Sequence, residues 1–159
     1  IRPQDVAEVR EENATVRVLS GSYKNNKGAV KGEYVKVQYL DVALEADCTW
    51  SYRETPNDHT LFLYLIDGTL AADKALTKFE GKACAMLMTA SSSNSSDFDE
   101  VKVKAGPEGA RFFLIAAMPL KEPVAWGGPI VMNTQEELNL AFRELENKTF
   151  IKHDKPQEL

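Results

Sequence analysis

The sequence is poor in the side chains that usually hold transition metals or act as activated nucleophiles. Its 159 residues include 2 cysteines and 2 histidines, with no Cys-x-x-Cys, His-x-His or His-Glu-x-x-His spacing. Cys48 and Cys84 are too few for a framework of disulfide bridges. We therefore expect a reducing, cytoplasmic location, with a single disulfide as the alternative. Gly-x-Ser-x-Gly and glycine-rich phosphate loops are also missing, so the sequence predicts no catalytic residue and no metal site.

Long apolar runs and basic blocks are missing as well. The apolar run at 61–66 is far shorter than the ~20 residues that a membrane-spanning helix needs. The chain has 19 Lys and Arg against 24 Asp and Glu, which gives a formal net charge of −5. Nucleic acid and anionic membranes are therefore not expected as partners. A composition of 43% hydrophobic and 27% charged residues is typical of a folded globular domain.

Alternating apolar and polar residues over the first two thirds of the chain predict short antiparallel strands. We expect strands at 15–19, 34–44, 61–66, 69–71, 76–79, 83–89, 101–104 and 111–116. A change of phase near Tyr39 indicates a bulge or a strand that crosses between two sheets. Asp67-Gly68 indicates a hairpin turn, and the Ser-rich stretch 90–97 indicates a loop. Many short strands at roughly ten-residue spacing favour an all-β jelly roll or barrel.

One amphipathic helix is predicted near the end of the chain. Thr134 and Glu137 have the spacing of a capping box, with Asn133 as an alternative cap. The apolar residues Leu138, Ala141, Phe142 and Leu145 then recur at i, i+3, i+4 and i+7. This stripe must dock on another part of the structure.

Few residues are candidates for ligand chemistry. We interpret His59 as a turn histidine that bonds to its own loop, and His153 as a solvated residue of the tail. Strand aromatics are more often core than ligand contacts. A pocket for an apolar ligand would be lined by Trp50, Phe62, Tyr64 and Met88.

The segment from Met118 to Leu138 carries a specific pattern, Pro-Leu-Lys-Glu-Pro followed by Gly-Gly-Pro-Ile-Val-Met-Asn-Thr. It resembles the closing signature of pirin-family proteins, with Ile130 in place of the usual Phe. The resemblance extends upstream through 110–116, 59–68 and 16–21. The motif residues are Glu122, Pro123, Gly128, Pro129, Val131, Met132, Asn133 and Thr134.

The resemblance implies an all-β fold, an antiparallel cupin or jelly-roll β-barrel with one C-terminal α-helix. It implies an interdomain-linker-like segment at 1–14, the cupin barrel at 15–133, the helix at 134–147 and a polar tail at 148–159. The resemblance implies a parent protein of two barrels in tandem, about twice this length, as in the pirin family. In that family the metal and the quercetin dioxygenase activity are associated with the N-terminal barrel. The chain would then be the second, C-terminal barrel.

A register count compares this barrel with a metal-bearing one. Counting back from Gly68 places the family's ligand slots at Glu54, Pro56 and Thr60, and residues 69–133 contain no histidine. We therefore expect a non-catalytic domain with no cofactor, iron or another divalent metal belonging only to the N-terminal cupin. That cupin is the expected partner, and two copies of this chain would pair in its absence. The alternatives are a quercetin 2,3-dioxygenase-like metal enzyme and a barrel that binds a small apolar ligand.

Overall fold

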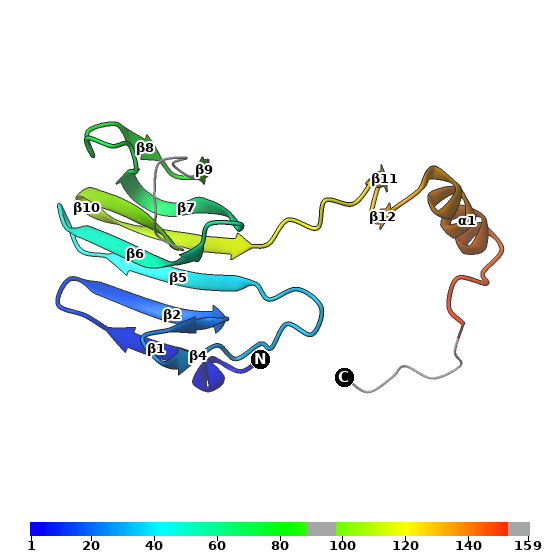
Figure 1. Cartoon of the computed structure of the whole chain (residues 1–159), viewed down its shortest axis with the longest axis horizontal. Coiled ribbons are helices and arrows are strands. Elements are labelled where there is room, and N and C mark those ends of the chain that lie inside the picture. Colours follow the sequence, from blue (N-terminus) through cyan, green and yellow to red (C-terminus); the bar gives the residue numbers. More distant parts are fainter. Residues whose placement is uncertain (89–97, 153–159) are drawn as a thin grey trace. The chain divides into compact units, whose positions relative to one another are not determined.

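The computed structural model describes residues 1–88 and 98–152, so the loop expected at 90–97 and His153 lie outside the described residues. The chain forms two compact units, Ile1–Pro119 and Leu120–Leu159, which are described separately (Figure 1). The segment expected to be linker-like contributes a strand, β1 (Ala7–Arg10), to the first unit. The domain bounds expected from the sequence therefore differ from the bounds of the compact units.

Antiparallel strands make up the first unit, after a short 3-10 helix, η1 (Pro3–Asp5). They are β1, β2 (Ala14–Ser20), β3 (Ser22–Tyr23), β4 (Asn26–Lys27), β5 (Gln38–Leu44), β6 (Thr49–Pro56), β7 (Thr60–Ala71), β8 (Phe79–Gly81), β9 (Ala85–Met88) and β10 (Phe98–Ala117). The order in the main sheet is β1-β2-β5-β10-β7-β8, with β6 paired to β10 and β9 paired to β7. β3 and β4 form a separate hairpin.

Two long strands, β7 and β10, change partners along their length. The first part of β10 pairs with β6 and its last part pairs with β5. In the same way β7 pairs first with β9 and then with β8. The ladder between β7 and β10 is irregular from Ala105 to Ala110, where both strands bend. The strands expected at 101–104 and 111–116 are therefore one strand, β10.

The hairpin predicted at Asp67-Gly68 is wrong, because β7 continues through both residues. Gly68 has a positive φ of 75°, and a Cβ there would lie 2.1 Å from the carbonyl oxygen of Gly109 on β10. The Asp-Gly pair correctly indicates a residue with positive φ, but this residue bends a strand and does not reverse the chain. Leu70 beyond the bend still pairs with Ala105 of β10.

The other predicted strands are confirmed with shifted ends, and some strands of the structure were not predicted. The strand expected at 76–79 begins at Phe79, and β6 was not predicted. A bulge lies opposite Tyr39, but its extra residue is Leu19 of β2, since the β2–β5 ladder shifts register between Val18 and Ser20. The strand that contains Tyr39 pairs regularly with β10, so the bulge is on the partner strand and not where the sequence predicted it.

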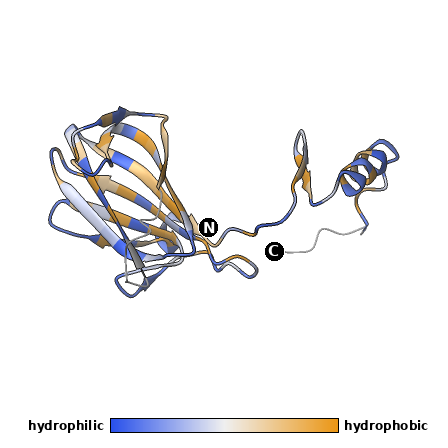
Figure 2. Cartoon of the chain, turned by 45° about the horizontal axis from the view of Figure 1, so that its top comes forward, coloured by the Kyte–Doolittle hydropathy of each residue, from blue (hydrophilic) through white to orange (hydrophobic). Residues whose placement is uncertain are grey.

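The core of the first unit is formed by alternate residues of the long strands, and Figure 2 shows the hydrophobic positions along them. Its fully buried members include Val16, Val18, Leu40, Val42, Leu63, Leu65, Leu70, Val103, Phe112 and Leu114. Period-two burial of this kind is what the antiparallel alternation in the sequence predicts.

The second unit is a hairpin followed by a helix. It contains β11 (Ala125–Gly127), β12 (Ile130–Met132) and α1 (Gln135–Glu146). The predicted capping box is confirmed: the Thr134 hydroxyl accepts from the Glu137 amide at 3.2 Å, and the Glu137 carboxylate accepts from the Thr134 amide at 2.9 Å.

The stripe on α1 docks only in part. Leu138 and Ala141 are buried, and Phe142 and Leu138 lie so close to Gly127 of β11 that a Cβ there would be 2.9 Å from the Phe142 ring. Leu145 is 45% exposed, so the C-terminal end of the stripe is not covered within this unit. No helix in the described ranges is both long and apolar enough to cross a lipid bilayer.

The bend at Gly68 should be sensitive to a single methyl group. We expect Gly68→Ala to lower the free energy of unfolding by about 2 kcal/mol or more, because a Cβ there meets Gly109 and the positive φ is strained. Gly81→Ala is the matched control, since nothing lies within 4 Å of a Cβ at Gly81. Urea unfolding followed by circular dichroism checks both, and equal stability of the two variants would contradict the bend.

Candidate functional site

The β6 strand carries two of the positions at which the sequence count placed metal ligands. Tyr52 pairs with Val101 and Thr55 pairs with Asp99, so Arg53 and Glu54 together oppose a single residue of β10. This extra residue is a bulge, and it reverses the alternation of side chains along the strand. Tyr52 and Thr55 are consequently buried, and Arg53 and Glu54 are exposed.

Aromatic side chains fill the interior next to this bulge. Trp50 stacks on Tyr52 with ring centroids 5.9 Å apart, and Tyr23 lies 6.1 Å from Trp50. The Trp50 indole donates to the Tyr23 hydroxyl at 3.2 Å, and that hydroxyl donates to Glu11. Burial raises the pKa of both the Tyr23 and the Tyr52 phenol above the usual range, so both stay neutral. These rings form a packed core at this end of the unit.

The residues at the three slots do not fit a transition metal. Glu54 is exposed, Pro56 has no donor atom in its side chain, and Thr60 offers an exposed hydroxyl. Iron, nickel or zinc needs three or four converging nitrogen, sulfur or carboxylate ligands. Within residues 1–88 and 98–152, no group of three or more His, Cys, Asp or Glu side chains is arranged to hold an ion.

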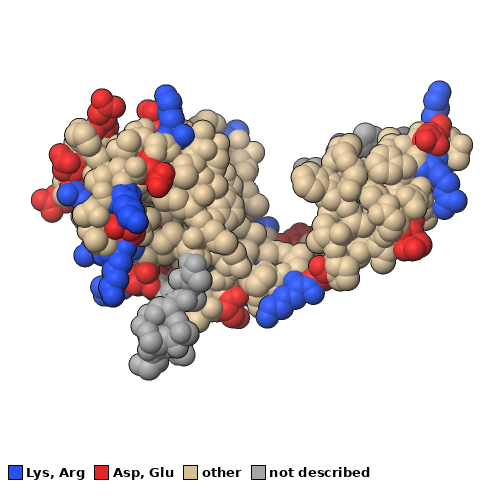
Figure 3. Space-filling model, turned by 90° about the horizontal axis from the view of Figure 1, so that it is seen from above, with Lys and Arg blue, Asp and Glu red and all other residues tan. Residues whose placement is uncertain are grey.

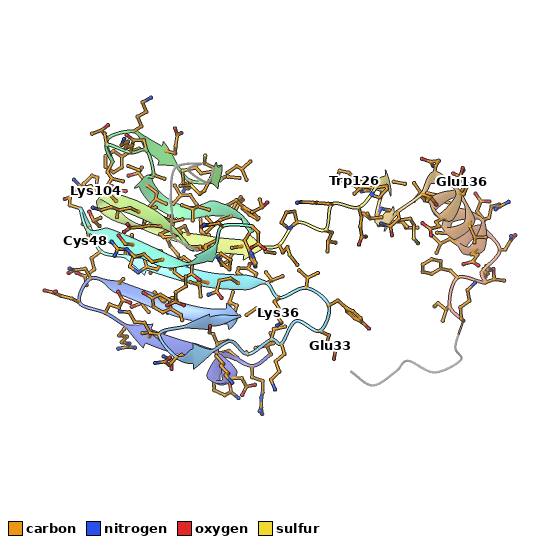
Figure 4. The ribbon with its side chains drawn as sticks, viewed as in Figure 1. Glu33, Lys36, Cys48, Lys104, Trp126 and Glu136 are labelled. Carbon is orange, nitrogen blue, oxygen red and sulfur yellow. The ribbon has the colours of Figure 1, made fainter. Side chains whose placement is uncertain are left out.

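A cleft of about 660 Å³ lies at the same end of the first unit. It is lined by the end of β2, the start of β5, the end of β6 and Ala116 near the end of β10. The loop before β5 adds Lys31 and Lys36, and β4 adds Lys27. Figure 4 shows Lys36 near the start of β5, at the opposite end of the strands from Cys48 and Lys104. Glu54, one of the three slot residues, lines the cleft as well.

Thr55 and His59 also line the cleft. Thr55 is 4% exposed, and its hydroxyl oxygen is buried with no hydrogen-bond partner in the described part of the chain. His59 is half-buried, and its Nδ1 lies 2.8 Å from a carboxylate oxygen of Asp58. The interpretation of His59 as a turn histidine bonded to its own loop is therefore confirmed. An orphan buried hydroxyl beside a cleft is uncommon in a folded protein.

The structure does not bring the four residues of the expected apolar pocket together. Trp50 lies in the core, whereas Phe62 and Tyr64 alternate with the buried leucines of β7 and lie on its other face. Met88 packs against the core from β9. None of the four lines the cleft. Cys48 and Cys84 are free, half-buried thiols, so the alternative of one disulfide is wrong.

The outer side of the sheet presents an apolar face. Leu87 of β9 pairs with Phe62 of β7, which pairs with Ile115 of β10, which pairs with Tyr39 of β5. Residues paired in this way share one face. The outer apolar face consists of Tyr39, Phe62, Tyr64, Leu87, Phe113 and Ile115. Leu87 is 71% exposed, so part of this face is open to solvent.

A buried carboxylate paired with partly exposed arginines lies beside the outer apolar face. Asp41 of β5 is 4% exposed and accepts hydrogen bonds from Arg111 at 2.9 and 2.7 Å. Arg17 approaches the same carboxylate at 3.7 Å. The hydrogen bonds to Asp41 raise the pKa of the Arg111 guanidinium. The two arginines compensate the buried charge next to Phe113, which pairs with Asp41. Figure 3 shows charged side chains crowded toward one side of the first unit, with largely uncharged surface beside them.

The family-motif residues hold the second unit together. The Asn133 amide donates to the Glu122 carboxylate at 2.9 Å and to the Pro123 carbonyl at 3.1 Å. Gly128 supplies the positive φ of the β11–β12 turn, and its carbonyl accepts from the indole of Trp126 at 2.7 Å. Asn133, the alternative helix cap, therefore ties the loop before β11 to the start of α1. The cap itself is Thr134.

Sequence reasoning missed the three lysines of the cleft and the Thr55 hydroxyl. The lysines recur at 27, 31 and 36 within an otherwise acidic chain, which is a signal that was available. The inward position of Thr55 depends on the β6 bulge. No local sequence pattern specifies that bulge.

The first unit is an antiparallel sheet in which two long strands, β7 and β10, exchange partners along their length. The model of the pirin C-terminal cupin domain matches residues 39–151, and the chain belongs to this family. Human pirin is 32% identical over 92% of this chain and 48% of its own length. Pirin-1 of Arabidopsis thaliana is 28% identical over 90% of this chain and 48% of its own length. The chain therefore spans about half the length of these curated relatives.

A solved structure supports the same fold. The crystal structure of a quercetin 2,3-dioxygenase from Acinetobacter baumannii matches with a TM-score of 0.76 over 94% of this chain and 49% of that protein. The sequence identity is 23%. The predicted all-β cupin fold with one C-terminal helix is thus confirmed.

Replacing the Thr55 hydroxyl tests whether it lacks a hydrogen-bond partner. We expect Thr55→Val to raise the free energy of unfolding by about 1 kcal/mol, because an unsatisfied buried hydroxyl is removed and the shape is kept. The melting temperature should rise by about 2–4 °C. Thr55→Ser, which keeps the hydroxyl and loses a methyl group, should be less stable than the native chain. A destabilised Thr55→Val variant would mean that the hydroxyl has a partner.

Proposed function

We propose that this chain is the non-catalytic C-terminal cupin of a two-cupin pirin-like protein, and that it supports a metal-bearing N-terminal cupin. The observation that carries the proposal is the outer apolar face. The domain requires no cofactor of its own, and the metal, iron or another divalent ion, belongs to the N-terminal partner. A cytoplasmic location is part of the proposal.

The outer apolar face supports a structural role because its exposure is costly in isolation. Leu87 and Tyr64 are 71% and 39% exposed, and they are continuous with Phe62 and Phe113 on neighbouring strands. Contiguous apolar patches on soluble domains usually mark interaction surfaces. The curated relatives are about twice the length of this chain. In our proposal the other half of such a protein covers this face.

The slot residues support a role without metal chemistry. An inward carboxylate at Glu54 would be the minimum for an ion, and the β6 bulge leaves this residue exposed. A structural neighbour from Acinetobacter baumannii, which is about twice this length, is named a quercetin 2,3-dioxygenase. In our proposal the matching half of a two-cupin protein contributes packing, and the other half contributes the ligands.

Metal analysis separates this role from the alternative of a metal enzyme. After incubation with Fe²⁺, Ni²⁺ or Zn²⁺ and gel filtration, we expect less than about 0.1 equivalent of metal per chain, because the slot residues supply too few ligands. Oxygen uptake with quercetin should equal that of a protein-free control. A full-length two-cupin relative treated in the same way is the positive control. One equivalent of retained metal would overturn the proposal.

Self-association tests the outer apolar face. Without a covering domain, we expect the chain to form dimers at high concentration in sedimentation equilibrium, and Leu87→Asp to weaken the association about tenfold or more. Leu140→Asp is the control, since Leu140 is 47% exposed on α1 of the second unit. A native chain that stays monomeric at every concentration would count against the exposed face as a partner surface.

A further inference from the structure

Positive charge gathers at the cleft although the chain is acidic. Lys27, Lys31 and Lys36 line it, and Glu54 is the acidic residue among its lining residues. In the part of the chain that the structure describes, none of the three ammonium groups forms an ion pair, whereas Lys24 nearby is paired with Glu11 at 2.8 Å. The formal net charge of the whole chain is −5. Three unpaired lysines at one concave site create a local potential that favours an anion.

The walls of the cleft are suited to an organic molecule. Val30, Val37, Pro56 and Ala116 contribute apolar surface between the lysines. The volume of about 660 Å³ lies within the range of ~300–1,000 Å³ that small-molecule sites usually have. An inorganic ion would fill a small part of such a space. A molecule with an acidic group and an apolar body would use both kinds of lining.

The orphan hydroxyl of Thr55 is the second, independent sign of a ligand. Thr55 is more than nine-tenths buried, it lines the cleft, and its hydroxyl has no partner among residues 1–88 and 98–152. By contrast, the Ser20 hydroxyl, also at the cleft, donates to the carbonyl of Val30 at 3.2 Å. A buried polar group without a partner is usually satisfied by something that binds there.

We propose that this cleft binds a small organic anion with an apolar body, such as an aromatic carboxylate or sulfonate. The lysines pair with the acidic group, the apolar body lies against Val30, Val37 and Pro56, and Thr55 completes the polar contacts. Because Glu54 and Pro56 occupy slot positions, the ligand sits at the end of the cupin where the family resemblance places a metal. The proposal does not rest on the structural role proposed above, since the cleft and the outer apolar face are separate surfaces.

A matched pair of fluorescent probes tests the proposal in the full chain. 8-Anilinonaphthalene-1-sulfonate is an organic anion, and N-phenyl-1-naphthylamine is the same ring system without the sulfonate. We expect the anion to bind at least tenfold more tightly than the neutral probe in low salt, and the difference to shrink as salt rises. Equal affinities would overturn the proposal. Competition by inorganic phosphate at equal concentration should be weak, and complete displacement would show a simple ion site instead.

Variants locate the binding. The combined change of Lys27, Lys31 and Lys36 to Gln should weaken binding of the anion at least tenfold and leave the neutral probe unchanged. Lys74, Lys78 and Lys82 changed to Gln provide the control, because they remove the same charge outside the cleft. An equal loss in this control would overturn the proposal.

Two further variants separate the cleft from the apolar face. Thr55→Val should weaken anion binding several-fold while remaining folded, as judged by its melting curve. Leu87→Asp, on the outer apolar face, should leave anion binding unchanged. If Leu87→Asp abolishes it, the probe is bound at the apolar face and the proposal fails, whatever the outcome for the structural role.

Discussion

The close approach of two glycines sets the architecture of the first unit. Gly68 of β7 and Gly109 of β10 both have positive φ, and a Cβ on Gly68 would fall 2.1 Å from the Gly109 carbonyl. A Cβ on Gly109 would in turn lie 2.7 Å from the carbonyl of Leu44, the last residue of β5. Three strands therefore meet where β7 and β10 bend. The bends let each strand serve two sets of partners, and that exchange of partners joins the elements into one core.

A second irregularity, the bulge at Arg53 and Glu54 in β6, determines which side chains face the interior there. With regular alternation after Tyr52, Glu54 would point inward and Thr55 outward. The extra residue exchanges them, so the carboxylate is exposed and a hydroxyl is buried. Trp50 and Tyr52, which precede the bulge, pack with Tyr23 in the interior. A one-residue insertion in a ladder thus turns the carboxylate of Glu54 away from the interior of this unit.

The sequence predicted the features whose signals are local. The alternation in β2, the capping box at Thr134 and the turn role of His59 need only neighbouring residues, and each is confirmed. The hairpin at Asp67-Gly68 was wrong because a left-handed glycine is compatible with a turn or a bend, and the partner strand decides between them. The cleft, the inward Thr55 and the outer apolar face depend on long-range register. That register was not accessible from one sequence.

Polar and apolar surfaces of the first unit have separate physical roles. On the outer apolar face the buried Asp41 is compensated by Arg111 and Arg17, whose side chains are partly exposed, so the carboxylate itself is withdrawn from water and paired. At the cleft the opposite holds, because the lysines are unpaired among the described residues and Thr55 lacks a partner. A carboxylate that is already paired and withdrawn from water adds little to the desolvation cost of covering the apolar surface beside it. Unsatisfied polar groups around a concave site suit a small ligand that supplies the missing contacts.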